Sequence, residues 1–531
     1  MTLRTANTRL RVRVRAGSQP VRIAGAPTAY GAADRVASEV SAWAPRTGSA
    51  EALLRHEREE IRGRARDLVR NSGYAAGAVR RETDAVVGAT LRPVPRLDAA
   101  ALGIEPAEAV RLKREIIAAW RSWAEDPRHI ADASRQQSLS GLFALAYRHY
   151  IVDGDALGVL HWDPSGTWAT RLRVVDPDLL STPDDRVESA RLMAGVETDR
   201  HGAPVAYHIR RAPDDLMVPD PDAWTWDRVP AETPWGRPVV VHFFDRERDG
   251  QRRGVSRFAS VVEALKMQDR YARSELQAAV LNAVFGLFIT SPYDESIFDT
   301  IMSAGAGEIS EYQSARKAFH GKEPITLDGV RVNRLFPGES IESTGARQVN
   351  QFADFEAAVL RRVAAGLGMS YEQLSNDWTK TNYSSARASL LEIWRGWTRA
   401  RRSFVDGFCA PVYMAFLEEA ADTGRVRLPA GAPSIMEAPG LWCRARWIGP
   451  GRGFVDPVKE AQAAQMRIAL GLSTATGEAA ELTGDDYDET RAELREEIAA
   501  TPAGVLHPAT ADWVDAFGAL PGRRDGQDTD G

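Results

Sequence analysis

The sequence predicts an α+β protein that is mainly helical and carries one antiparallel, β-rich portion. Three observations predict this class. Stretches with apolar residues three or four positions apart flank the middle of the chain. Residues 150–249 instead show short apolar runs broken by Gly, Asp and Pro, which is typical of strands. Helical patterns return at Ser256 and, apart from one mixed block, continue towards the C-terminal end.

Length and composition narrow the class of protein further. The chain has 531 residues, too many for one compact core and enough for about three or four units of ordinary size. Its formal net charge is −6, whereas a protein that grips DNA over most of its surface would be clearly basic. Local basic patches remain compatible with this balance. The two cysteines, Cys409 and Cys443, cannot build a disulfide framework or a thiolate metal site, so we expect a reducing compartment.

The N-terminal part is expected to be an arm followed by helices. Residues 1–50 are rich in small residues, and their arginines precede any acidic residue, a composition that also occurs in transit peptides. The alternation in RLRVRVR favours a strand or an extended basic arm, and no continuous apolar stretch indicates a secretory signal. We expect helices from Glu51, around Pro106, which suits a first helical turn, and from Ala131 to Tyr150.

The middle of the chain predicts strands and then a long helix. RLMAGVETDRHGAPVAYHIR has the pattern of a hairpin, and RPVVVHFF that of a further strand. A helix of about thirty residues is expected from Ser256. It contains the longest apolar run, Leu276–Thr290, which is too short to span a membrane and is expected to be a buried helix. A mixed block with Gly-rich turns follows at about residues 291–347.

Two helices are expected to flank one polar segment. The first spans Asn350–Gly368 and ends at a glycine, where a helix stop belongs. The second begins at Ser384 or Ser385 and runs to about residue 421, with a kink at Pro411. The last eighty or so residues are predicted to be helical again, with an acidic tail.

The segment between these helices, GMSYEQLSNDWTKTNYSSAR, has the residue types of an active site and also those of a mobile polar loop. A nucleophilic serine would need a strand-to-helix elbow with flanking glycines, which this segment lacks. Ser384 and Ser385 precede an apolar-periodic run, so both are expected to cap the helix. Trp378 and Lys380 have no obvious packing role, and a cation beside a flat ring suits a DNA backbone. A solvated lysine and a tryptophan packed beneath the loop is the alternative that these residues leave open.

Elsewhere the sequence predicts no catalytic residues, no metal site and no cofactor. It lacks a phosphate-binding loop, and its nine histidines form no zinc-binding pair. Asp153, Asp155 and Asp163 are conceivable metal ligands, but they lie at turns, where aspartate is common for turn geometry alone. A metal-dependent nucleic-acid hydrolase that uses Asp153, Asp155 or the loop residues is therefore kept as the alternative function.

Several segments, in their order and spacing, resemble the portal proteins of tailed bacteriophages, specifically the lambda-type family. The resemblance runs from about residue 50 to about residue 475. The segments that carry it are ARDLVRNSGYAAGAVRRETDAVVG, RVVDPDLL, GVETDRHGAPVAYHI, HFFDRERDGQRRGVSRFASVVEALK, LFPGESIE, FADFEAAVLRRVAAGLGMSYEQLSNDWTKTNYSSARASLLE and WIGPGRGFVDPVKEAQA.

The resemblance implies a portal fold and a structural function. Such a protein would form a ring, usually a dodecamer, at one capsid vertex of the virion, and its channel would serve DNA packaging and viral genome ejection. Its partners would be double-stranded DNA, the terminase large subunit, a head–tail connector or adaptor, and the major capsid and scaffold proteins, with no membrane. Assembly would take place in the host bacterial cytoplasm, and the arm would be a candidate for proteolytic trimming.

The resemblance also implies a division of the chain. The regions would be a flexible basic arm (1–50), a wing (51–290, with helices at 51–150, a β-rich part at 150–249 and a helix at 256–290), a small α/β clip (291–347), a stem helix (348–368), a tunnel loop (371–385), a long kinked wing helix (386–421), a wing closing segment (422–460) and a helical crown with an acidic tail (461–531). The tunnel loop would present Trp378, Lys380 and Asn382 to moving DNA.

Overall fold

The predicted α+β class is confirmed by a computed structural model. The structure describes residues 42–213, 220–288, 325–327, 330–332, 352–379, 381–453 and 456–502, with residues 318, 507 and 509. Within these residues helices form most of the regular structure, and every strand pair is antiparallel. Most of the predicted arm and the acidic tail lie outside the described residues.

The N-terminal helices are α1 (Ala50–Leu54), α2 (Arg58–Asn71), α3 (Gly73–Val86), α4 (Ala99–Leu102), α5 (Pro106–Ala124) and α6 (Leu139–Asp153). Pro106 lies in the first turn of α5, as predicted, because a proline there removes no intrahelical hydrogen bond. The helix expected from Ala131 begins only at Leu139. The Asp132 carboxylate accepts hydrogen bonds from the backbone N–H groups of Gln136 and Gln137 and so holds a turn instead.

The predicted β-rich portion consists of two antiparallel sheets. The first has the order β3 (Thr170–Val175), β2 (Ala156–Trp162) and β8 (Val240–Phe243). The second has the order β4 (Leu192–Met193), β5 (Val196–Thr198), β6 (Pro204–Arg210) and β7 (Trp226–Pro230). The predicted hairpin is confirmed as β5–β6, in which Val196 is paired with Tyr207. A further pair joins β1 (Arg92–Pro95) to β11 (Ala445–Ile448), which are distant in sequence.

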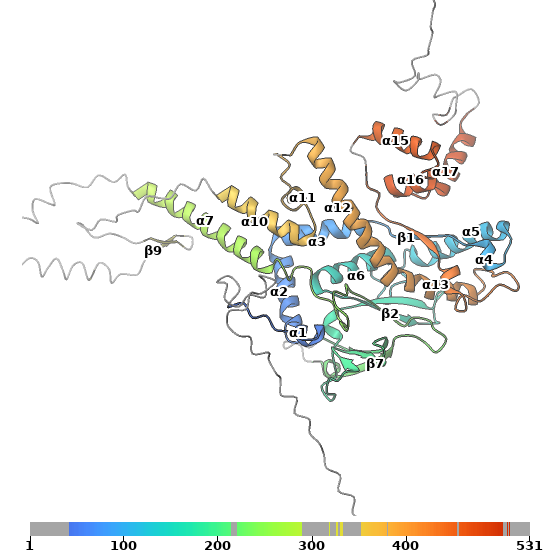
Figure 1. Ribbon diagram of the computed structural model, residues 1–531, viewed down its shortest axis with the longest axis horizontal. Helices are drawn as coiled ribbons and strands as arrows, with labels where there is room; N and C mark the ends of the chain where they lie inside the picture. Colours follow the sequence, from blue (N-terminus) through green and yellow to red (C-terminus); the bar gives the residue numbers. More distant parts are fainter. Residues whose placement is uncertain are drawn as a thin grey trace, which may run out of the picture.

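Two long helices, α7 (Val262–Phe288) and α10 (Phe352–Leu367), lie side by side and project from the body (Figure 1). They pack through Tyr271, whose ring stacks on that of Phe352 with centroids 5.5 Å apart. The helix expected from Ser256 begins six residues later, because residues 256–261 form turns. Most of the predicted block 291–347 lies outside the described residues. Its described strands are β9 (Ile325–Leu327) and β10 (Val330–Val332), which form an antiparallel pair.

The interruption predicted at Pro411 takes the form of a π-helical turn. The long helix consists of α12 (Tyr383–Phe404), the π-helical turn η4 (Val405–Cys409) and α13 (Ala410–Asp422). Proline has no backbone N–H and its ring conflicts with the carbonyl four residues earlier. The chain avoids this conflict with a wider turn, in which the Ala410 N–H donates to the Val405 carbonyl five residues back.

Up to residue 502, the predicted helical C-terminal part is also confirmed. It contains α15 (Pro457–Ala469), α16 (Ala475–Leu482) and α17 (Tyr487–Ala500), preceded by the short α14 (Pro439–Trp442). Two ion pairs attach the start of α17 to α5. Lys113 Nζ lies 2.5 Å from Asp488, and an Arg121 guanidinium nitrogen lies 2.5 Å from Glu489.

The centre of the core is an aromatic cluster between α5 and α13. Phe416 stacks on Trp123, and Trp120 meets Phe416 edge to face, with ring centroids 5.1 Å apart in both pairs. Tyr413 adds a further edge contact to Trp120 at 5.6 Å. All four side chains are buried. Because each such ring buries about 150–250 Å², this cluster is a main source of hydrophobic stabilisation.

Two adjacent carboxylates of α13 hold the β-rich portion against this core. Glu419 accepts hydrogen bonds from the backbone N–H groups of Ala169 and Thr170, at 2.6 and 2.8 Å. Glu418 accepts from an Arg237 guanidinium nitrogen at 3.0 Å and from Trp235 Nε1 at 2.7 Å. Both carboxylates are buried, so these charge-assisted bonds fix where the helix meets the sheet.

A buried ion pair lies where the helices, the two sheets and α7 meet. Arg253 Nε donates to Asp155 Oδ2 at 2.6 Å, and both side chains are almost completely buried. The other Asp155 oxygen accepts from the Gly254 N–H at 2.6 Å and contacts His242 Nε2 at 3.1 Å. The remaining Arg253 nitrogens donate to the carbonyls of Leu180 and Pro177, on the chain between the sheets. Every nitrogen of the Arg253 guanidinium and both oxygens of the Asp155 carboxylate therefore have a hydrogen-bonding partner.

In the part of the run Leu276–Thr290 whose burial the structure describes, residues 276–280, the expectation of a buried helix was wrong. Leu276 and Val280, in the apolar run taken for a buried helix, are 66% and 41% exposed. The physical reason is that this part of α7 projects beyond the body, where α10 is the described helix that lies beside it (Figure 1). Among the described residues, no helix has both the length and the hydropathy needed to cross a membrane.

Replacing Asp155 by asparagine is expected to lower the free energy of unfolding by about 3–5 kcal/mol at pH 7, because it leaves Arg253 buried without its counter-charge. Urea unfolding followed by circular dichroism measures this. The matched control is Glu60→Gln, which breaks the exposed Arg64–Glu60 pair and is expected to cost at most about 0.5 kcal/mol.

The same variant carries a pH signature. Burial works to raise the pKa of Asp155, but the charge of Arg253 and the His242 contact outweigh it and hold the pKa far below the usual range. A depressed folded-state pKa stabilises the protein above the unfolded value of about 4 and loses this contribution as the pH falls. The difference in free energy of unfolding between the wild type and Asp155→Asn should therefore become smaller below about pH 4. A difference that does not change with pH would contradict the assigned role of the Asp155 charge.

Candidate nucleic-acid interface

The segment between α10 and α12 begins with a short helix. Gly368 ends α10 with φ +71°, the left-handed conformation that glycine adopts without strain. Helix α11 (Tyr371–Ser375) follows, and its N-terminus is a capping box: Ser370 accepts a hydrogen bond from the Gln373 N–H, and the Gln373 side chain accepts one from the Ser370 N–H. Asn376 ends α11 with φ 59°.

Helix α11 is fixed to its neighbours rather than free in solvent. An Arg81 guanidinium nitrogen on α3 donates to the Gln373 carbonyl. The Arg361 guanidinium on α10 lies 5.0 Å from the centre of the Tyr371 ring, a cation–π distance. Leu374 is buried in the core with 3% of its surface exposed. The first part of the predicted loop, residues 371–375, is therefore a short packed helix.

The second half of the segment is a set of local turns. Asp377 Oδ1 accepts hydrogen bonds from the Thr379 N–H at 3.1 Å and from its hydroxyl at 2.5 Å. The other Asp377 oxygen accepts from the Tyr371 hydroxyl at 3.2 Å. The Thr381 N–H donates to the Trp378 carbonyl at 3.2 Å. Aspartate and threonine thus serve turn geometry here, and the residue types that suggested an active site have a structural use.

Of the three residues expected to face DNA, the structure describes Trp378 and Asn382. Trp378 is at the turn with 42% of its surface exposed, so it is not packed beneath the loop. Lys380 lies outside the described residues. The Asn382 side chain accepts a hydrogen bond from the Ser385 N–H at 2.9 Å, which makes Asn382 the N-cap of α12.

The predicted caps were therefore wrong. Helix α12 begins at Tyr383, so Ser384 and Ser385 lie within its first turn and not before it. Asn382 has the extended backbone of a cap residue, with φ −85° and ψ 162°, and asparagine caps as well as serine does. The sequence reasoning also missed α11, although the pattern Ser370-x-x-Gln373 is the signature of a capping box and could have revealed it.

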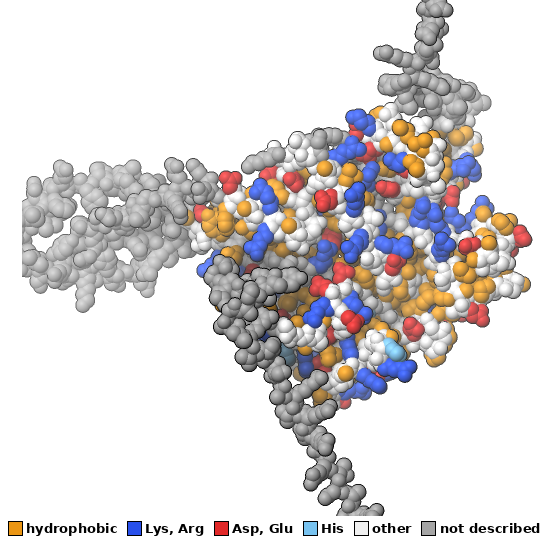
Figure 2. Space-filling view, viewed as in Figure 1, with side chains coloured by type: hydrophobic (Ala, Val, Ile, Leu, Met, Phe, Trp, Pro, Cys, Tyr) orange, Lys and Arg blue, Asp and Glu red, His pale blue; other side chains and the backbone are white. Residues whose placement is uncertain are grey.

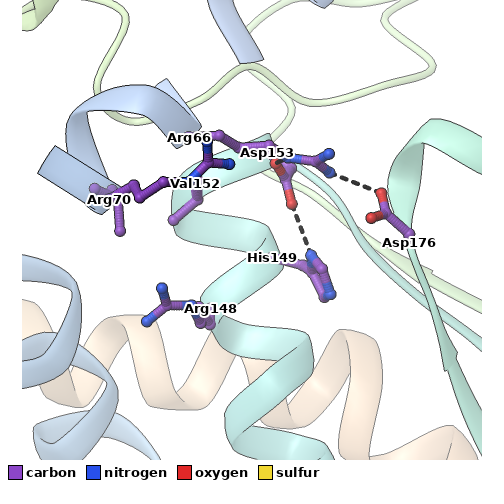
Figure 3. A pocket seen from close by; sticks show the side chains of 8 residues that line it. Arg66, Arg70, Arg148, His149, Val152, Asp153 and Asp176 are labelled. Carbon is purple, nitrogen blue, oxygen red and sulfur yellow. Dashed lines mark hydrogen bonds and ion pairs between the residues drawn. The ribbon is translucent and has the colours of Figure 1, made fainter. Parts of the chain in front are cut away.

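The aspartates of the hydrolase alternative lie in separate ion pairs. Asp153 Oδ1 accepts from Arg66 Nε at 2.6 Å, and Oδ2 contacts His149 Nδ1 at 2.7 Å (Figure 3). Burial works to raise the pKa of Asp153, but the bonds from His149 and Arg66 outweigh it and lower the pKa. Asp155 is bound to Arg253, as described above, and Asp163 pairs with Arg171 at 2.6 Å.

These three carboxylates do not converge on one point. Among the described residues, no group of three or more His, Cys, Asp or Glu side chains is placed to hold a metal ion. The cavity beside Asp153, of about 360 Å³, is lined by residues of α2 and α6 together with Asp176, and Arg66 bridges Asp153 and Asp176 across it (Figure 3).

The family model "Phage portal protein, lambda family" matches residues 37–401, from before α1 into α12, and this range includes the loop between α10 and α12. The match covers more than half of the chain and confirms the resemblance inferred from sequence. The chain therefore belongs to the lambda family of phage portal proteins.

Two portal proteins are similar over nearly the whole chain. The portal protein of Escherichia phage N15 is 34% identical over 509 residues, 94% of this chain and 95% of its own. Portal protein B of Escherichia phage lambda is 35% identical over 492 residues, 91% of each chain. A probable portal protein of Halomonas phage phiHAP-1 is 24% identical over 482 residues.

Comparison with solved structures matches this chain to chains of gene transfer agent particles. A chain from the neck of the native particle matches with a TM-score of 0.34 and 13% identity, covering 79% of this chain and 93% of its own. A chain from the native virion matches with a TM-score of 0.37, also at 13% identity, covering 83% and 96%.

Replacing Arg81 by alanine is expected to loosen α11, because the Gln373 carbonyl loses its donor from α3. Hydrogen exchange at the amides of residues 371–375 should become about tenfold faster. Arg80→Ala is the matched control, since Arg80 is the exposed neighbour on the same helix. Equal acceleration in both variants would refute the anchoring role of Arg81.

Replacing Asn382 by alanine should destabilise the first turn of α12 by about 1 kcal/mol, the usual cost of losing an N-cap. Amide exchange at residues 384–386 reports this directly. Asn382→Ser should restore protection, and Ser385→Ala should leave it unchanged because only the backbone N–H of Ser385 takes part in the cap. Loss of protection in Ser385→Ala alone would return the cap to the serine first predicted.

Proposed function

We propose that this portal protein works as a ring of identical subunits, expected to be a dodecamer, at one capsid vertex of the virion. Double-stranded DNA would pass through the central channel during packaging and ejection. Membership of the lambda portal family is the observation that carries this proposal. A ring of this kind needs no catalytic residue and no cofactor of its own, because the chain only guides DNA that another protein moves.

Exposed apolar side chains on α7 and α10 support assembly with further copies. Met267 and Leu276 are 69% and 66% exposed, and Phe355 on α10 is 46% exposed. Soluble monomers seldom leave several large apolar side chains uncovered on one pair of helices. Neighbouring subunits of a ring would cover them, which also accounts for a helix that projects away from its own body (Figure 1).

The proposed regions follow the division expected from the family. Helices α7 and α10 would form the stem, the β-rich portion and the N-terminal helices would form the wing with α12 and α13, and α15 to α17 would form the crown. Residues 291–347 would supply the clip. The arm, residues 1–50, would either bind packaged DNA or an acidic scaffold or be trimmed during maturation.

The loop between α10 and α12 would be the tunnel loop, with Trp378, Lys380 and Asn382 facing the channel. The exposed ring of Trp378 supports this placement. The net charge of −6 fits a sliding contact, because binding tightens with each phosphate that a protein neutralises. Figure 2 also shows positively charged side chains (Lys, Arg) and negatively charged ones (Asp, Glu) interspersed over the visible face rather than in separate patches. A few contacts per subunit would guide DNA without stopping it.

The partners proposed for the ring are the terminase large subunit, a head–tail connector or adaptor, and the major capsid and scaffold proteins. Assembly is proposed to occur in the host bacterial cytoplasm. The alternative, a metal-dependent nucleic-acid hydrolase, has no observation in its favour, because its aspartates are held in structural ion pairs. Cutting of DNA in the presence of Mg²⁺ or Mn²⁺ that is lost in Asp155→Ala would revive it.

Replacing Trp378 by alanine is expected to leave rings intact and to lower packaged or retained DNA severalfold, because the loop loses its exposed ring. Deletion of residues 377–381 should act in the same direction and more strongly. Mass photometry counts the subunits per ring, and DNA protected from nuclease measures packaging.

The matched control is Trp224→Ala, since Trp224 is 63% exposed on the short helix η3 (Pro221–Trp224) at the β-rich portion. Normal DNA filling in Trp378→Ala and in the deletion would reject the tunnel-loop assignment. A strictly monomeric wild-type protein under every assembly condition would reject the ring itself.

A further inference from the structure

Helices α15 and α16 enclose an apolar groove that the rest of the described chain does not fill. Its volume is about 530 Å³. The lining side chains are mostly small and apolar: they are Ala461, Ala464, Gln465, Ile468 and Ala469 of α15 with Glu478, Ala479 and Leu482 of α16 and Thr483. Alanines at four of these positions leave room that larger side chains from elsewhere can occupy.

The helix α15 and the turn after it also carry large apolar side chains that are exposed and do not line the groove. On α15 and the turn after it, Val458 and Met466 are 60% and 62% exposed, and Leu470 and Leu472 are 69% and 74% exposed. Figure 2 shows hydrophobic side chains gathered over these C-terminal helices. Isolated exposed apolar residues are ordinary, but several of them on one short helix and the turn after it, beside an apolar groove, favour a binding surface.

The groove is suited to an apolar occupant rather than to a charged one. Its single carboxylate, Glu478, is held by two hydrogen bonds from the Arg467 guanidinium, at 2.9 and 2.5 Å. These bonds lower the pKa of Glu478 and neutralise its charge locally. A ligand that enters the groove therefore meets methyl groups and a satisfied ion pair, so its affinity must come from apolar burial.

A segment of this chain has the matching chemistry. Residues 511–520, ADWVDAFGAL, lie outside the described residues, and their sequence places Trp513, Phe517 and Leu520 at positions i, i+4 and i+7. That spacing gathers large side chains on one face of a helix, the pattern by which amphipathic helices bind apolar grooves. Asp512 and Asp515 fall outside this spacing, so they would remain in solvent.

The chain between His507 and this segment can span a distance equal to the length of a helix of the C-terminal unit. His507 Nε2 lies 3.7 Å from Glu497 of α17, so the chain is still beside the C-terminal helices at that point. The six residues from His507 to Trp513 can span about 20 Å. This equals the length of α15, since 13 residues rise about 20 Å in a helix.

We propose that residues 511–520 bind in the groove between α15 and α16 of their own chain, with Trp513 and Phe517 inserted among the alanines. The C-terminal segment would then act as a fourth element of this helical unit and cover its exposed apolar surface. This proposal is independent of the DNA-conduit function, because it concerns how the C-terminal unit completes its own core.

Disulfide trapping tests the proposal in the full-length protein. Ala479→Cys in the groove is combined with Phe517→Cys, and the linkage formed under mild oxidation is identified by peptide mapping, which distinguishes it from the native Cys409 and Cys443. We expect a 479–517 disulfide within one chain. The control pair is Glu493→Cys with Phe517→Cys, since Glu493 is exposed on α17 and does not line the groove.

The outcomes separate clearly. A disulfide between two chains would overturn the proposal, because it would assign the groove to the segment of a neighbouring copy. The proposal would also be overturned if the 479–517 disulfide formed no faster than the 493–517 disulfide of the control pair. A second measurement does not depend on new cysteines: Trp513→Ala with Phe517→Ala should make amide exchange in α15 and α16 about tenfold faster. Asp512→Ala with Asp515→Ala should leave it unchanged, and equal acceleration in both double variants would reject insertion of the aromatic residues.

Discussion

The Asp155–Arg253 ion pair is the interaction on which the arrangement of this chain depends. Asp155 lies between α6 and β2, and Arg253 lies between β8 and α7, so the pair joins four elements at one buried point. Breaking such a pair leaves an uncompensated charge in the core, so the site accepts only the native arrangement. Glycine is also required there, since a Cβ on Gly254 would lie 1.9 Å from the Gly154 carbonyl oxygen.

The helices α7 and α10 connect this buried ion pair to the candidate interface and determine where the interface lies. Helix α7 starts a few residues after Arg253 and packs along α10. Glu356 of α10 accepts hydrogen bonds from Tyr74 of α3 at 3.2 Å and from Gln268 of α7 at 2.9 Å. Helix α10 therefore has a fixed orientation when it reaches α11, and Trp378 is held on an anchored segment. Such precise placement is what the proposed conduit of repeated subunits would require of a segment that contacts DNA.

The sequence predicted the class of fold and most helices because those signals are local. Apolar periodicity, a proline in the first turn of α5 and a glycine after α10 each act within a few residues. Sequence patterns did not predict burial or side-chain partners where these depend on residues far away in the chain. Nothing near Leu276 indicates that α7 projects from the body, and the buried partners of Asp155 come from positions about ninety residues away. The cap of α12 was missed for a smaller reason: asparagine and serine are equally good caps, so composition alone could not choose among Asn382, Ser384 and Ser385.

The π-helical turn η4 has a consequence for the phase of the long helix. One extra residue in a helical turn rotates everything beyond it by about 100° relative to an uninterrupted helix. Before the turn, α12 keeps one face in solvent, and after it Val412, Phe416 and Leu417 are all fully buried. Within the turn, a Cβ on Gly407 would lie 2.5 Å from the ring of Phe243. The continuous helix thus has two apolar faces with different orientations, one in α12 and one in α13. The π-helical turn between them allows the two halves to pack in different surroundings.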